Sequence, residues 1–370
     1  MIKSKIDMAT VWALRGWAYD TADTNAPLSL DIYVNDQLID QIKADNKRDK
    51  LVESGMHPTG KAGFSFYLGD RIEIKTGDKL LIKTGSELIF EQELPIIAYT
   101  PSEANQSILI VGQGKSGTSK LTYVVSGGMN EDVNVHFEPK GRHGLSDISL
   151  HKNLTQELPV VTKSLYTPKA KARFGNLSRL YDRKIWILRD PRDRTISLFL
   201  YRWFKGHKPN KQKYLSALEL VKRKEADPAS VNITDIWNIV YAPGMYKKRL
   251  KEEYEQLDHI ISNLDDSWYI LPYEYMVDGN LGGLNNYLGF ETVLDREVPH
   301  KFSRVVRSKG YGNWRNWFTE EDIEFYKDTI GPFISKYCSH VDDWNISNSP
   351  QLEPSKGSEY MQRLFNGTKN

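Results

Sequence analysis

One stretch, residues 107–120, constrains the fold more than any other part of the chain. It begins with a run of β-prone apolar residues at 108–111, which is typical of a short buried strand. Gly112 and Gly114 interrupt this run, and apolar residues then recur at helical spacing after Lys120. A strand, a glycine-rich turn with a lysine and a helix suit an anion, because N–H groups at the helix start point toward it. We therefore expect an anion-binding turn here.

The composition restricts the kind of anion that this turn can serve. The chain has 370 residues and a formal net charge of +2. Because this charge is small, we expect no nucleic-acid partner and a strictly local anion site. The single cysteine, Cys338, fits a reducing compartment, so we expect a cytoplasmic protein. No run approaches the ~18 apolar residues of a membrane span, and residues 1–7 lack an apolar core of signal-peptide length.

Residues 1–97 predict an all-β domain. Apolar and polar residues alternate in short segments, and turn residues such as Asn35-Asp36 join them into hairpins. Short strands at this spacing favour a β-sandwich. We expect a structural or docking module. The alternative is a carbohydrate-binding or partner-binding module with Trp12, Trp17 and Tyr33 as stacking groups.

After a proline-containing linker at residues 98–106, strands and helices alternate over residues 107–345. This alternation favours an α/β domain in which helices cover a parallel sheet. Strands are expected at 107–111, 132–138, 158–163, 184–189 and 268–271. Helices are expected at 169–181, 191–204, 214–224, 233–257 (interrupted near 243–244) and 320–337. The polar residues 346–370 predict a loosely ordered tail.

The turn after the first of these strands departs from the loop of nucleoside triphosphatases. A Walker A loop has a glycine five residues before the Gly-Lys-Ser/Thr sequence. Gly114-Lys115-Ser116 is present, but the first glycine would fall at Leu109. A P-loop kinase is therefore an alternative and not the preferred interpretation. A non-catalytic module with an anion pocket is a second alternative.

Two further clusters of cations follow. Arg189 stands at the end of the strand 184–189, where open α/β sheets bind ligands, and Ser197 lies eight residues later. A guanidinium can fork onto a phosphate that a hydroxyl also reaches. For Arg192 and Arg194 we expect a solvated helix start instead. The third cluster, residues 306–319, places cations beside glycines ahead of a helix, which again suits a phosphate.

These clusters, in this order, resemble those of the sulfotransferases that use 3′-phosphoadenosine 5′-phosphosulfate (PAPS). Gly114-Lys115-Ser116-Gly117-Thr118-Ser119 is similar to the family's loop for the 5′-phosphosulfate, with Gly for Pro and Ser for the second Thr. Arg189 and Ser197 match the spacing of the family's pair on the 3′-phosphate. Pro272-Tyr273-Glu274 also resembles an element that follows the family's last strand.

The third cluster resembles the family's late loop over the 3′-phosphate less closely. Arg307, Lys309 and Gly310 match residues of that loop, with Ser308 inserted between the arginine and the lysine. The insertion weakens the assignment of Arg307 more than that of the other two. The resemblance covers roughly residues 105–340, and the β-domain lies outside it.

The resemblance implies a P-loop-like sulfotransferase fold and in-line transfer of a sulfuryl group from PAPS to a hydroxyl acceptor. Adenosine 3′,5′-bisphosphate (PAP) would be the product, and no metal would be needed. The acceptor would be a small molecule or, by closer similarity to carbohydrate sulfotransferases, a glycan. Lys115 would neutralise the leaving 5′-phosphate, and Lys163 matches the family's second lysine.

The sequence offers two candidates for the general base. Lys163-Ser164 is followed by Leu165 where cytosolic members carry a histidine. Glu138 resembles the carboxylate of glycan-directed members and is the first choice, and His136 is the second because alternation puts both on one strand face. The structural alternatives are a strand-end salt bridge for Glu138 and a packed ring for His136.

Overall fold

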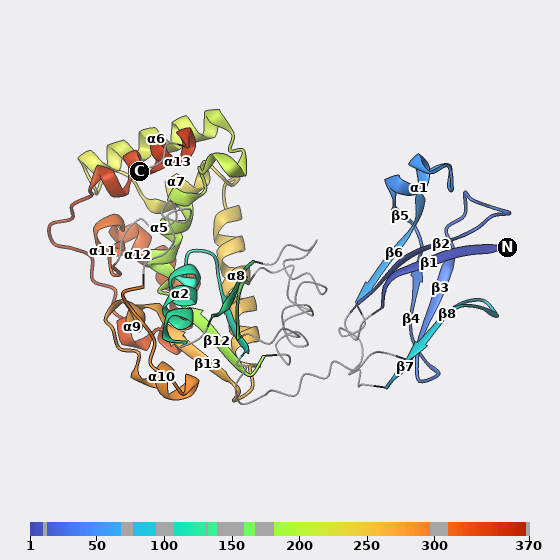
Figure 1. Ribbon diagram of the computed structural model, residues 1–370. Coiled ribbons are helices and arrows are strands. Elements are labelled where there is room, and N and C mark those ends of the chain that lie inside the picture. The colour runs from blue at the N-terminus through green and yellow to red at the C-terminus, as the bar shows by residue number, and fades with distance from the viewer. Residues whose placement is uncertain are drawn as a thin grey trace. The chain divides into compact units, whose positions relative to one another are not determined.

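The computed structural model describes residues 1–9, 13–67, 77–93, 107–129, 132–138, 159–166, 181–296 and 310–367. The chain divides into two compact units. The described residues of the first unit lie within 1–93 and those of the second within 107–367 (Figure 1). The linker predicted at 98–106 and nearly all of the helix predicted at 169–181 lie outside the described residues.

The first unit consists of two antiparallel four-stranded sheets, as the alternating pattern predicts. One sheet has the order β1-β2-β6-β5, formed by Ile2–Ala9, Ala13–Asp20, Lys61–Tyr67 and Asn46–Lys47. The other has the order β4-β3-β7-β8, formed by Gln37–Lys43, Ser29–Val34, Lys79–Thr84 and Glu87–Glu93. A short helix, α1, spans Asp49–Glu53. One core cluster draws residues from both sheets, among them Leu14, Ile32, Phe64 and Ile82, as in a sandwich.

Of the aromatic residues considered as stacking groups, Trp17 and Tyr33 lie on different sheets of this unit. Trp17 alternates with the core residue Ala18 on β2, so its ring lies on the outer face, against Tyr19 and Leu51 of α1. Tyr33 alternates with Ile32 on β3 and lies on the outer face of the other sheet. Trp12 is outside the described residues.

The second unit contains a five-stranded sheet in the order β10-β11-β9-β12-β13. Every neighbouring pair is parallel, so the α/β prediction is confirmed. The strands are β9 (Ser107–Gly112), β10 (Asn134–Phe137), β11 (Val160–Leu165), β12 (Arg183–Leu188) and β13 (Trp268–Pro272). Each residue of β9 is buried, which explains its continuous apolar run.

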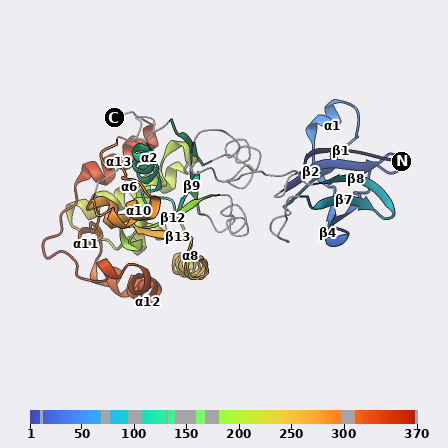
Figure 2. The same cartoon turned by 60° about the horizontal axis from the view of Figure 1, so that its bottom comes forward.

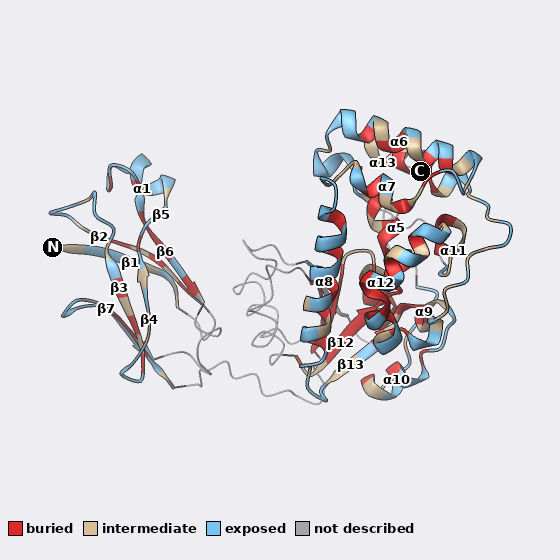
Figure 3. Cartoon of the chain, turned by 180° about the vertical axis from the view of Figure 1, so that it is seen from behind, coloured by how far each residue is buried: buried red, intermediate tan, exposed pale blue. Residues whose placement is uncertain are grey.

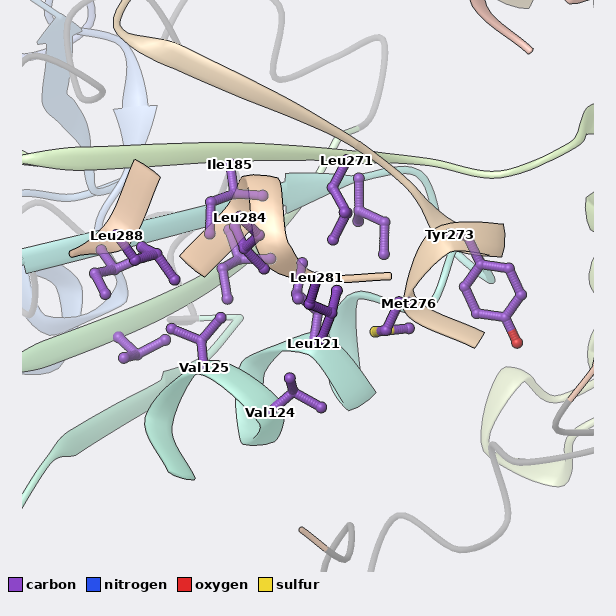
Figure 4. Packing of buried hydrophobic residues seen from close by; sticks show 14 residues of the cluster. Leu121, Val124, Val125, Ile185, Leu271, Tyr273, Met276, Leu281, Leu284 and Leu288 are labelled. Atoms are coloured by element: carbon purple, nitrogen blue, oxygen red, sulfur yellow. The ribbon is translucent and has the colours of Figure 1, made fainter. Parts of the chain in front are cut away.

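One face of this sheet is covered by α2 (Thr118–Gly128) and α10 (Gly282–Leu288). Figure 4 shows Leu121, Val124 and Val125 of α2 pointing toward Ile185 of β12 and Leu271 of β13. Leu284 and Leu288 of α10 belong to the same cluster. This packing fixes the start of α2 against the strand that precedes it.

The remaining helices were largely predicted. They are α5 (Pro191–Tyr201), α6 (Lys211–Ala226), α7 (Ile233–Asn238), α8 (Met245–Ile261), α9 (Tyr273–Val277), α11 (Trp314–Trp317) and α12 (Glu320–Tyr337). The interruption expected near residue 243 separates α7 from α8. α8 and α12 lie side by side (Figure 2). None of the helices in the described ranges has the length and hydropathy needed to cross a bilayer.

The prediction of a loosely ordered tail at 346–370 is wrong. Helix α13 (Ser358–Asn366) buries Tyr360, Met361 and Leu364, and Phe365 stacks on Tyr214 of α6 with ring centroids 3.7 Å apart. Figure 3 shows buried and exposed positions together on this helix. Its apolar residues are few but recur at helical spacing, so that a polar composition conceals an amphipathic helix.

Candidate anion-binding site

The site is built at the edge of the parallel sheet where the strands end. Gly112, the last residue of β9, is paired with Ile187, and Leu188 is paired with Pro272 at the end of β13. Because the strands are parallel, the loop after β9, Arg189 after β12 and Tyr273 after β13 all lie at this edge. The residues that the sequence suggested for this site therefore lie at one edge of the sheet.

The loop between β9 and α2 has a left-handed backbone at two positions. Lys115 has a φ of 72° and Gly117, the residue before α2, has a φ of 87°. A Cβ atom at Gly117 would lie only 2.5 Å from Cδ2 of Tyr273, so only glycine fits. The first turn of α2 carries no acidic residue and Gly117 offers no side-chain cap, an arrangement that suits an anion at this helix start.

Arg189 connects the second cluster to this loop. Its Nη1 donates to the carbonyl oxygen of Lys115 at 3.0 Å, and the guanidinium lies 4.5 Å from the ring centroid of Tyr273. Within the described part of the chain, Nε of Arg189 and Oγ of Ser116 are buried and have no hydrogen-bond partner. Such groups are expected where a polar ligand completes a site. Ser197 is also buried, further along α5.

The expectation that Arg192 and Arg194 are solvated is wrong, since both are buried. The Arg192 guanidinium lies between the rings of Trp314 and Trp344, 4.0 and 4.6 Å from their centroids, and pairs with Asp190 at 2.9 Å. Arg194 donates through Nε to the carbonyl oxygen of Gly114 at 3.0 Å. These hydrogen bonds, to Asp190 and to the carbonyl oxygen of Gly114, offset the free-energy cost of burying the two guanidinium charges.

The third cluster is described from Gly310 onward, and Arg307 and Lys309 lie outside the described residues. Asp193, buried in the first turn of α5, accepts hydrogen bonds from the N–H groups of Gly312 and Trp314. The segment that follows Gly310 is therefore fastened to the helix that carries the second cluster.

Glu138 and Lys163 lie together as an ion pair. Lys163 Nζ donates to Glu138 Oε1 at 2.5 Å, and the N–H of Glu138 donates to the carbonyl of Lys163 at 3.0 Å. Lys163 was expected at a strand end, but β11 continues to Leu165, and the Lys163 side chain is buried. The salt bridge considered as a structural role for Glu138 is present.

The prediction that His136 shares a strand face with Glu138 is wrong. β10 ends at Phe137, and Glu138 has a φ of 45°, so the alternation of faces stops before it. Lys163 and Phe137 are register partners on one face, whereas His136 pairs with Thr162 on the other. Burial lowers the pKa of His136, and its Nε2 has no partner among the described residues.

The acidic groups near the site have partners within the protein. Burial raises the pKa of Asp190 to about 6, and the ion pair with Arg192 opposes that shift. Glu274 accepts the N–H of Asp190 at 2.9 Å through one oxygen and lies 3.1 Å from His340 Nε2 through the other. In the ranges that the structure describes, no three or more His, Cys, Asp or Glu residues gather as metal ligands would.

Sequence reasoning missed two residues that contact the loop. Glu253 of α8 accepts from Gln113 Nε2 at 2.7 Å and from Arg194 Nη2 at 2.9 Å through the same oxygen. Tyr201, at the end of α5, places its ring centroid 4.2 Å from Lys115 Nζ. Glu253 stands in a run of charged helical residues, and nothing local distinguishes it from its solvated neighbours.

No family model matches the chain, and no curated protein matches it. Among solved structures, the chain is similar to the mouse sulfotransferase SULT7A1 complexed with PAP. The sequence identity is 16%, the TM-score is 0.41, and the match covers 65% of this chain and 90% of that chain.

Proposed function

We propose that this protein is a sulfotransferase that moves a sulfuryl group from PAPS to a hydroxyl acceptor. The observation that carries the proposal is the hydrogen bond from Arg189 to the carbonyl of Lys115, residues 74 positions apart. It joins the lysine loop and the second-cluster arginine into one site. Two cationic groups that follow different strands suit a nucleotide that is phosphorylated at two positions better than they suit a single phosphate.

The loop is suited to hold the 5′-phosphosulfate. Sulfuryl transfer resembles phosphoryl transfer in its loose transition state, so catalysis depends on alignment and on stabilising charge on the leaving oxygen. The N–H groups at the start of α2 and the hydroxyl of Ser116 are the donors for the 5′-phosphate. Lys115 neutralises the charge that develops when the bond to sulfur breaks.

The 3′-phosphate is assigned to Arg189 and Ser197. The Tyr273 ring under the Arg189 guanidinium holds that group in one plane, which favours a forked contact with phosphate oxygens. Lys309 and Gly310 belong to this site by resemblance, as does Arg307 with the weaker match. The link from Asp193 to Gly312 supports a late loop near α5.

For the general base, Glu138 is the better-supported candidate. Its side chain is 48% exposed, so an acceptor can reach the carboxylate from solvent while Lys163 orients it. His136 is disfavoured because its ring lies on the opposite face of the sheet from Lys163. The proton of the acceptor hydroxyl would thus pass to Glu138 as the oxygen attacks sulfur.

A carbohydrate acceptor is part of the proposal. Rings of Tyr201, Phe204 and His207 gather beside Lys115, with centroids 5.4 to 5.8 Å apart, and sugar rings pack well on aromatic faces. Residues 194–218 contain no acidic residue and several cations, so the neighbouring surface suits an acidic sugar chain.

A cytoplasmic location, which the lone buried cysteine supports, belongs to the same proposal.

The test is a titration of thermal stability with PAP and, separately, with ATP–Mg²⁺. A ligand at 100 times its Kd stabilises a protein by about 2.7 kcal/mol, so binding is readily measured. We expect PAP to raise the Tm and Arg189→Ala to remove most of that response. Arg249→Ala, at an exposed position of α8, is the control. Preferential stabilisation by ATP–Mg²⁺ would support a P-loop kinase, and no response to either would support a binding module.

A further inference from the structure

Lys115 is held in a strained backbone conformation by two arginines. Its φ of 72° lies in the left-handed region, which residues other than glycine seldom adopt. The peptide group before Lys115 is held through the carbonyl of Gly114, which accepts from Arg194 Nε at 3.0 Å. The peptide group after it is held through the carbonyl of Lys115 itself, which accepts from Arg189 Nη1 at 3.0 Å.

Holding both peptide groups fixes the backbone dihedral angles of the residue between them. A trans peptide is planar, so a carbonyl that points toward Arg194 directs the N–H of Lys115 the opposite way. Hydrogen bonds from charged donors are the strong class, and both arginines that donate here are buried. These two contacts are therefore suited to stabilise the left-handed backbone at Lys115, which the loop by itself would not keep.

Arg194 is itself fixed by α8. Its Nη2 donates to Glu253 Oε1 at 2.9 Å and its Nη1 donates to the Tyr254 hydroxyl at 3.2 Å. The same oxygen of Glu253 accepts from Gln113 Nε2 at 2.7 Å, so one carboxylate fixes both the arginine and the residue that opens the loop. Each nitrogen of the guanidinium therefore donates at least one hydrogen bond.

We propose that Arg194 and Glu253 are positioning residues that hold Lys115 in its left-handed conformation before any ligand arrives. They do not touch the reacting atoms in this assignment. They act by presenting the Lys115 ammonium and the N–H groups after it in the geometry that an anion needs. The ligand's identity rests on the proposed function, but the effect on the loop is a property of the free protein.

The first experiment measures amide hydrogen exchange of the ligand-free protein at residues 113–118. We expect Arg194→Met to speed exchange there by about tenfold or more, while exchange in β12 stays as in the wild type. Arg194→Lys, which keeps a charged donor, should rescue part of the protection. Arg249→Met, on the exposed side of α8 one turn before Glu253, should have no effect. Unchanged loop exchange in a folded Arg194→Met protein would overturn the proposal.

A double-mutant cycle separates positioning from general support of the fold. Glycine adopts the left-handed region without penalty, so in a Lys115→Gly background the loop should no longer depend on Arg194. In a Lys115→Ala background, which also lacks the ammonium but keeps the penalty, the dependence should persist. If Arg194→Met speeds exchange equally in both backgrounds, the arginine merely supports the fold and the proposal fails. Glu253→Gln serves in the same cycle if Arg194→Met does not fold.

The second readout is the Kd of PAP measured by calorimetry. Arg194→Met should weaken PAP binding about 10- to 100-fold, and Arg194→Lys less. If the wild-type protein does not bind PAP, the proposed function is contradicted. The exchange experiment then still tests whether Arg194 holds the conformation of Lys115 in the free protein. PAP binding that is unchanged in Arg194→Met would overturn the proposed positioning role.

Discussion

Lys163 of β11 forms an ion pair with Glu138, the residue after β10, and the two side chains differ widely in exposure, at 5% and 48%. The buried ammonium depends on this partner, because removing one member of such a pair leaves the other charge uncompensated. Glu138 therefore has a structural function whether or not it takes the proton of an acceptor. The two functions can be separated, because glutamine can still accept a hydrogen bond from Lys163 but cannot act as a base.

Glu138→Gln should lower turnover by about 10²- to 10⁴-fold, the usual contribution of a general base, with little change in PAP binding. Steady-state sulfuryl transfer and calorimetry measure the two effects. Glu138→Ala should also lower the free energy of unfolding, by about 1–3 kcal/mol, because it leaves a buried donor unsatisfied. Wild-type turnover in Glu138→Gln would exclude this residue as the base.

Gly117 and Gly114 provide a matched pair of substitutions in the loop. Gly117→Ala should abolish PAP binding and destabilise the protein, because φ is 87° and the new Cβ would meet Tyr273 at 2.5 Å. Gly114→Ala should be tolerated, since a Cβ there has nothing within 4 Å. Thermal unfolding with and without PAP compares the two variants. Equal tolerance of both would show that the loop adopts another conformation.

The sequence was sufficient to predict the parallel sheet, because β9, β12 and β13 are short apolar runs that alternate with helical patterns. It also located the loop and Arg189, since a strand end is a local feature. It did not predict β1, whose lysines make it look like a polar edge until it pairs with β2. Tertiary pairing of this kind has no local signal.

The burial of charged side chains could not be predicted from the sequence either. Arg192 and Arg194 stand in a run that reads as a solvated helix start, and apart from Asp190 their acceptors lie 59 to 151 residues away. The tail was misjudged because the few apolar residues of α13 are buried by packing against distant elements that include α5 and α6. Composition describes a segment alone, whereas these residues acquire their environment from distant elements.

Asp193 is predicted to hold the segment after Gly310. Because its carboxylate accepts from the N–H groups of Gly312 and Trp314, Asp193→Ala should cost about 1–3 kcal/mol and speed amide exchange at 312–316. Urea unfolding and hydrogen exchange provide these measurements. The control is Asp342→Ala, which should leave amide exchange at residues 312–316 unchanged. Protection of 312–316 that survives in Asp193→Ala would contradict the anchoring role.

We predict that the free energy of unfolding depends on pH through the buried Lys224. Its ammonium is buried and donates to the carbonyls of Pro228 and Val231, and burial lowers its pKa to about 8, with Asp322 opposing the shift. Between about pH 8 and the ordinary lysine value of 10.5, the unfolded chain binds more protons than the native protein. Stability from this group therefore rises with pH in that window, by at most ~1.4 kcal/mol per pH unit.

Buried tyrosines set the upper limit of the pH range in which stability rises. Burial raises the pKa of Tyr246, Tyr254 and Tyr326, so above about pH 10 the unfolded tyrosines lose protons that the native ones keep, and stability falls. Urea unfolding between pH 8 and 10 should show a rise in the wild type that Lys224→Met lacks. Exposed Lys222→Met is the control, and a rise that persists in Lys224→Met would assign the dependence to another group.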